Sequence, residues 1–309
     1  MPTDRHLRPT LSSEKKTLPQ SEKPNAAEVD ARFAAWVQSN VVNKSDADKN
    51  AAANNAHDAA AKSSAPQVIV LNFELPDQLP PLEPLPVSGA ADLLDAVEQA
   101  LDFDADETTR EIAVMEMGEH RAANAVEALT QVALYDECAR LRVNALDALG
   151  KFDHESTFET ILLACIDIAR EVRAAAARTL SRLSFDRATA YNRIAESCDA
   201  ERIRLAAMAC VDANLVNHAF TRLIHEDRKH RAEAFAMIRL LVAANNYEPI
   251  VKTVYSHADS SIRLATIQAV KTLKPKQIPR ELADLIGNEN LPAPVADALA
   301  DLLDTVARA

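Results

Sequence analysis

Hydrophobic and polar positions recur with the 3.6-residue period of amphipathic helices along most of the chain from Ala90 onward. One segment returns repeatedly: an arginine followed by small apolar positions, as in LRVNALDALG from Leu141. The anchor arginines are Arg110, Arg142, Arg173, Arg204, Arg231 and Arg263. Five steps cover the 153 residues from the first to the last, so the mean period is about 31 residues. A period of this length predicts stacked supersecondary units.

A second, shorter helical pattern lies between successive copies of the arginine segment. It begins at Ala125, Phe158, Tyr191, Phe220 and Ile250. Two antiparallel helices per period follow, and a leading pair from Ala91 with a closing pair from Glu281 to Ala309 brings the total to seven pairs. Acidic residues that suit helix N-termini precede the arginines: Asp106, Glu137, Asp167, Asp199, Asp227 and Asp259. Gly118 and Gly150 are expected to close their helices.

The copy that contains Arg231 departs from the pattern. It follows the previous anchor by 27 residues, His230 replaces an apolar residue, and the next helix is long. We expect the local twist to differ there, which is typical either of a bend or binding site or of drift in a tolerant repeat.

Composition divides the chain into three segments. Residues 1–66 are rich in Ser, Lys, Asn, Asp and Ala and predict a disordered arm with a short amphipathic helix near 27–41. Residues 67–89 form a proline-rich, acidic linker or cap segment. Residues 90–309 are almost continuously helix-forming and predict one repeat domain that is large enough to bury a full core.

The pattern D-x-x-x-[IVL]-R-x-x-A-x-x-A-L-G resembles the HEAT repeat, and its short period resembles the bilin-lyase-type HEAT-like subclass. The resemblance covers residues 90–309 and implies an all-α fold, a right-handed α-solenoid. It also implies ladders of aspartate and arginine between neighbouring repeats, with Asp167 serving Arg173 and Asp259 serving Arg263. We therefore interpret the six anchor arginines as structural residues that fix how the copies stack.

The formal net charge of −12 is concentrated, because residues 67–110 hold ten acidic residues and one arginine. No basic stripe marks a phosphate-binding surface, so nucleic acid and anionic membranes are disfavoured as partners. The sequence contains no signal-peptide pattern and no membrane-spanning apolar run, which predicts a cytoplasmic protein. Its four cysteines form no C-x-x-C pair and are expected to be reduced.

No catalytic motif emerges, so we predict a non-catalytic scaffold or adaptor without metal or cofactor. Phosphate-loop and nucleophile-elbow motifs are absent. The main alternative is a bilin-lyase-like enzyme or chromophore-handling protein. A lesser alternative, also from resemblance, is a HEAT-like metal-dependent hydroxylase, which needs four His-Glu pairs; this chain has only His154-Glu155 and His225-Glu226.

Partner binding is predicted on the concave face, which the second helices line in HEAT arrays. Helical spacing places a set of small, apolar and basic residues there: Arg178, Arg182, Ala206, Ala209, Ala213 and Leu240. Such a floor suits a peptide or a partner helix, with the arginines attracting acidic residues. The competing interpretation is that the small residues pack adjacent helices together.

Two N-terminal segments are further candidates for protein contacts. Phe33 and Trp36 share an apolar face of the helix predicted near 27–41, which either anchors a partner or folds back on the solenoid. Leu79, Leu82 and Leu85 recur every third residue among prolines, the spacing that aligns side chains in a polyproline II helix. This strip either docks in a partner groove or covers the end of the first helix pair. The oligomeric state is not determined by the sequence.

Overall fold

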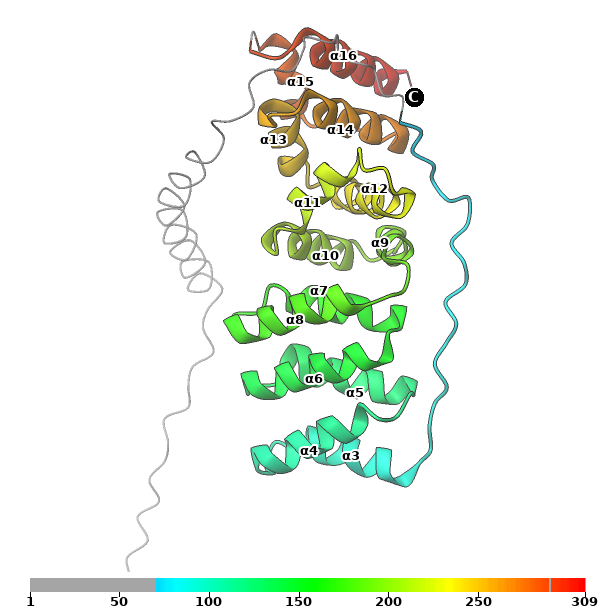
Figure 1. Cartoon of the computed structure of the whole chain (residues 1–309), viewed down its shortest axis with the longest axis vertical. Coiled ribbons are helices and arrows are strands. Elements are labelled where there is room, and N and C mark those ends of the chain that lie inside the picture. The colour runs from blue at the N-terminus through cyan, green and yellow to red at the C-terminus, as the bar shows by residue number, and fades with distance from the viewer. Residues whose placement is uncertain (1–70, 289, 309) are drawn as a thin grey trace, which may run out of the picture. The chain divides into compact units, whose positions relative to one another are not determined.

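Helices stack in a column over residues 71–288 and 290–308, the part of the chain that the computed structural model describes (Figure 1). The fourteen α-helices of these residues form seven successive pairs, as predicted. The first helices of the pairs are α3 (Ala91–Leu101), α5 (Ala123–Tyr135), α7 (Phe158–Ala164), α9 (Arg187–Ala195), α11 (Leu215–Arg222), α13 (Glu248–Ser256) and α15 (Arg280–Ala283). The second helices are α4 (Glu107–Met117), α6 (Ala139–Phe152), α8 (Arg170–Arg182), α10 (Ala200–Asp212), α12 (Arg228–Ala243), α14 (Ser260–Leu273) and α16 (Ala293–Ala307).

Two 3-10 turns, η1 (Glu155–Thr157) and η2 (Asp284–Gly287), complete the regular structure, and the described residues contain no strand. The arrangement confirms the predicted all-α, HEAT-like repeat fold. The arm predicted for residues 1–66, with its helix near 27–41, lies outside the described residues.

Acidic residues begin four of the second helices, as the sequence predicted. Their carboxylates accept hydrogen bonds from N–H groups of the first turn and so satisfy donors that have no partner inside the helix. These N-caps are Asp106, Asp199, Asp227 and Asp259. The prediction is wrong for Glu137 and Asp167, because α6 and α8 have Cys138 and Ala169 as N-caps, without a side-chain cap. The hydroxyl and the N–H of Thr109 both donate to Asp106, and these bonds lower the pKa of that carboxyl.

Gly150 has a different function from the one predicted. It does not end its helix, because α6 continues to Phe152 and stops where Asp153 adopts a left-handed conformation with φ of 42°. A Cβ atom added at Gly150 would lie 2.7 Å from Cγ2 of Thr179 on α8. The glycine therefore allows α6 and α8 to approach closely.

A continuous apolar core runs between the two helices of each pair. Its largest fully buried side chains include Phe158 and Tyr191, whose rings meet edge to face with centroids 4.9 Å apart. This contact joins α7 to α9 and so links the third pair to the fourth.

The second helices stack on one another in two separate runs. One run comprises α4, α6 and α8, and the other comprises α10, α12, α14 and α16. Between them the order changes, because α10 packs on α7 rather than on α8, and α12 packs on α9. The copy with Arg231 lies at the start of α12, a 16-residue helix that packs mainly on α9. Beyond the break, one side of α8 borders α11, α12 and the end of α10 across hollows instead of packing closely on a second helix.

Candidate partner-binding surface

The anchor arginines hold the turns that precede the second helices. The guanidinium groups of Arg142, Arg173 and Arg231 each donate to the two carbonyl groups five and six residues earlier in the chain. For Arg142 the distances are 2.7 Å to the carbonyl oxygen of Asp136 and 3.3 Å to that of Glu137. Arg263 makes the equivalent bond to the carbonyl of His257. The motif therefore satisfies carbonyl groups that the turn leaves without helical partners.

Two of the arginines also form a ladder to the next repeat. Arg110 pairs with Asp136, and Arg142 binds both carboxylate oxygens of Asp167 at 2.8 Å. The direction differs from the one that the resemblance implied, since Asp167 accepts from the arginine of the preceding repeat. Arg173 binds only carbonyl oxygens, of Asp167 and Ile168. The side chain of Asp259 caps α14 rather than binding Arg263.

The ladder ends where its acidic residue is lost. Asp136 and Asp167 lie six residues before their anchor arginines, and the corresponding residues in the next three copies are Cys198, His225 and His257. A thiol or an imidazole offers no carboxylate to the preceding arginine. The change is visible in the sequence as a substitution at one fixed position, six residues before each arginine.

Arg204 is not part of the ladder, which corrects the prediction for this anchor. Its guanidinium is half-exposed and pairs with Glu201 on the same helix. The adjacent Arg202 instead binds Glu159 of α7, with both Nε distances at 2.8 Å. The cross-repeat contact of α10 is therefore directed toward α7, in agreement with its altered packing.

The stacking break exposes a basic face of α8. We call the residues on this side the open face: Arg170, Arg173, Ala174, Ala177, Arg178 and Ser181, all exposed except the half-buried Arg173. Arg170, Arg173 and Arg178 form no ion pair within residues 71–288 and 290–308. Helix α8 carries four arginines against one glutamate in a chain of net charge −12. The open face is thus a local positive surface on an acidic protein.

Two hollows border the open face. One, of about 340 Å³, is lined by Arg170, Arg173 and Ala177 together with Asp212 and Leu215. Partial burial raises the pKa of Asp212, so its carboxylate is less stable as an anion there than in water.

The other hollow, of about 190 Å³, lies between α8, α11 and α12 and shares Ala177 and Leu215 with the first. Its acidic residue, Glu233, faces Arg187 at 3.3 Å and Arg222 at 3.7 Å. The two arginines offset the charge of Glu233, which leaves the border of the open face predominantly cationic.

The predicted partner-binding residues fall into two groups. Arg178 and Arg182 are exposed on α8, where Arg182 also binds Asp147 at 2.9 Å, and Ala213 lines the larger hollow. Ala206, Ala209 and Leu240 have no exposed surface, so the prediction that they form an open floor is wrong. Small side chains at these positions let helices approach closely, which was the competing interpretation.

The proline-rich segment lies on the solenoid itself. Residues 71–89, here called the strap, run along one side of the helix column toward α3 (Figure 1). The ring of Phe73 stacks on Phe235 of α12 with centroids 4.9 Å apart. At the other end, Ser88 and Asn124 of α5 exchange hydrogen bonds of 3.1 and 3.0 Å.

The three strap leucines are therefore held by the chain's own helices, and the strap extends far beyond the first helix pair. Leu79 lines a hollow with α9 and α12, Leu82 lines one with α7 and α9, and Leu85 packs against the core. Leu79 and Leu85 are half-buried there, whereas Leu82 remains exposed. Phe33 and Trp36 lie outside the described residues.

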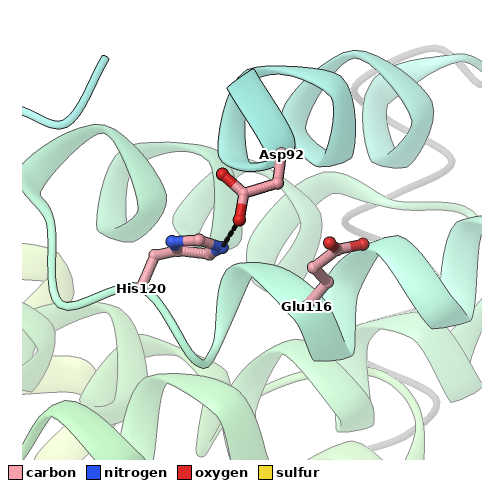
Figure 2. A group of neighbouring side chains, drawn as sticks. All are labelled: Asp92, Glu116 and His120. Carbon is pink, nitrogen blue, oxygen red and sulfur yellow. Dashed lines mark ion pairs between the residues drawn. The ribbon is translucent and has the colours of Figure 1, made fainter. Parts of the chain in front are cut away.

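One group of potential metal ligands appears among the described residues. Asp92 of α3, Glu116 of α4 and His120 of the following turn place their ligand atoms within 4.8 Å of one another (Figure 2). The imidazole Nε2 lies 3.6 Å from a carboxylate oxygen of Asp92. Both carboxylates are exposed, and we assign this cluster a structural ion pair within the first helix pair. No single sequence motif marks this cluster, because its residues come from separate elements.

Comparison with known proteins supports the repeat assignment. Residues 94–181 match the family model described as HEAT repeats. No curated protein matches the sequence. None of the described helices is long and apolar enough to cross a bilayer.

Two solved structures are similar to this chain at low identity and low TM-score. An engineered protein is 18% identical, with 71% of this chain and 98% of that one covered and a TM-score of 0.28. The complex of CpcE and CpcF of phycocyanin lyase from Nostoc sp. is 17% identical, with 76% of this chain and 99% of that one covered and a TM-score of 0.29. Similarity at this level carries no argument about activity.

Proposed function

We propose that this HEAT-repeat chain is a protein-binding scaffold and that the open face of α8 binds an acidic, amphipathic helix of a partner. The observation that carries the proposal is the stacking break between α8 and α10, because the residues of the open face stay exposed there and border hollows instead of packing on a second helix. On the other side of the same helix, α6 packs closely against α8. A partner helix would occupy the side that the next second helix leaves empty.

The side chains of the open face suit a helix as ligand. Ala174 and Ala177 provide a small, apolar centre that permits close approach of a second helix. Arg170 and Arg178 lie at either end of this centre, eight residues apart along α8 and on its exposed side. Together they favour a partner with apolar residues along one face and carboxylates on both flanks.

Electrostatics favour an acidic protein over nucleic acid. The cations form a short local patch, while the chain as a whole carries a net charge of −12. A phosphate backbone would meet long-range repulsion beyond the patch, whereas a short acidic helix contacts only the patch itself. The bilin-lyase-like and hydroxylase alternatives are not proposed, because no observation on the described residues favours them.

The proposal is tested with a fluorescent synthetic helix that has an alanine and leucine stripe flanked by glutamates. Its affinity for the full chain is measured by anisotropy in wild type and in the double variant Arg170→Glu, Arg178→Glu. The double variant should bind at least about tenfold more weakly, because attraction is replaced by repulsion at both ends of the site.

The matched control is the double variant Lys252→Glu, Lys276→Glu, which makes the same change in net charge at two exposed lysines on α13 and after α14. Its affinity should stay close to wild type. Equal weakening in both double variants would show a nonspecific charge effect and would reject the open face as the site.

A further inference from the structure

The strap contacts each of four successive helix pairs of the solenoid. Ser88 meets Asn124 in the second pair, and Glu83 meets His154 in the third. Pro80 meets Arg193 in the fourth pair, where the guanidinium lies 2.7 Å from the proline carbonyl oxygen. In the fifth pair Glu74 lies 3.0 Å from Arg228, next to the stacked phenylalanine rings. The extended segment therefore follows the repeat of the helices.

Three of these contacts are hydrogen bonds to main-chain carbonyl groups of the strap that lie three residues apart. The carbonyl oxygens of Pro80, Glu83 and Pro86 accept hydrogen bonds from Arg193, His154 and the N–H of Ala123, at 2.7, 2.9 and 2.8 Å. A polyproline II helix has three residues per turn, so carbonyls at this spacing point to one side. Proline lacks an N–H donor, which leaves the carbonyls as the groups that a receptor can bind.

The imidazole of His154 is oriented as a hydrogen-bond donor to the strap. Nδ1 of His154 accepts the N–H of Ser156 at 3.2 Å, and Nε2 therefore carries the proton that is donated to the carbonyl of Glu83. The 3-10 turn η1 fixes the ring next to the strap. Glu155 of the same turn binds Arg193 at 2.5 Å and orients the next donor.

The leucines add a side-chain pattern with the same period. Leu79 and Leu82 lie at hollows between helices, and Leu85 packs against the core. Most of the strap's other side chains remain exposed. A receptor of this kind selects backbone conformation and leucine spacing while tolerating the residues between them.

We propose that this surface is a recognition site for extended, proline-rich segments of other proteins with leucines three residues apart, and that the strap is its internal ligand. The hydrogen-bond donors and hollows of this surface would bind such a segment from any protein. A tethered segment has a high effective concentration, so a partner binds only by displacing the strap. The site is separate from the open face of α8.

The test uses the full chain and a fluorescent synthetic peptide with the sequence LNFELPDQLPPLEPLPVS, residues 71–88. The double variant Phe73→Ala, Leu82→Ala, here called the loosened variant, weakens the binding of the strap to the helices and leaves the residues of the helices unchanged. The peptide should bind this variant at least about tenfold more tightly than wild type, because a larger fraction of the sites is vacant. A scrambled peptide of the same composition should not bind.

Asn124→Ala, added to the loosened variant, should abolish most of the gain, because the described side-chain bonds of Asn124 are both to Ser88. Asn217→Ala on α11 is the matched control, since Asn217 is exposed and bonds to Asn214. Circular dichroism and melting curves check that each variant is folded. Equal peptide binding to wild type and loosened variant, or equal binding of the scrambled peptide, would overturn the proposal. Dimer formation by strap exchange without peptide binding would also overturn it.

Discussion

At the scale of single residues, the arginine that marks the repeat is chiefly a ligand for main-chain carbonyls. Arg142, Arg173 and Arg231 reach back to the same two positions of their own turns, whatever side chains stand there. This local geometry explains why the arginine persists after the acidic ladder ends at Asp167. A charge-assisted bond to a carbonyl needs no partner in the next repeat.

Arg142→Ala should lower the free energy of unfolding by about 2–4 kcal/mol, because two carbonyls lose a donor and the half-buried Asp167 carboxylate keeps only the N–H of Ala169. Arg204→Ala is the matched control and should change it by no more than about 0.5 kcal/mol, since its ion pair is exposed. Urea denaturation of both variants measures the difference. Similar losses in the two would show that the arginine contributes mainly through helix propensity.

At the scale of helices, the sequence predicted what is determined locally. The number of pairs and the caps at Asp106, Asp199 and Asp259 follow from periodicity and from acceptors at helix starts. The end of α6 was mispredicted because Gly150 serves a contact with Thr179, which is distant in the sequence. The burial of Ala209 could not be predicted from the sequence either, because alanine occurs both on exposed helix surfaces and in tight helix interfaces.

Substitution of one buried and one exposed alanine by glutamate tests the assignment of buried and exposed positions. Ala209→Glu should destabilise the chain by several kcal/mol, because a carboxylate would enter a fully buried position without a partner. Ala177→Glu on α8 should change stability by no more than about 0.5 kcal/mol, because that side chain is exposed. Thermal melts of the two variants provide the comparison, and a large loss for Ala177→Glu would mean that the open face is packed.

At the scale of the whole molecule, function depends on how the repeats stack. The interval between Arg204 and Arg231 is shorter than the others, which predicted a different local twist near Arg231. The sequence did not predict that α10 packs on α7 rather than on α8. Stacking is decided by contacts between residues of different repeats, such as Arg202 with Glu159. The strap spans this break, since its contacts lie on α5 before it and on α12 after it.

The central claim is that α8 presents an uncovered face, and thiol labelling tests it most directly. Mass spectrometry would follow the reaction of each cysteine with a maleimide in the variant Ala177→Cys. Two native residues serve as standards: Cys198 is exposed, whereas Cys210 is fully buried and burial raises the pKa of its thiol. We predict that Cys at position 177 reacts at a rate close to that of Cys198 and is protected by the acidic helix. Reaction as slow as that of Cys210 in the free chain would contradict the account.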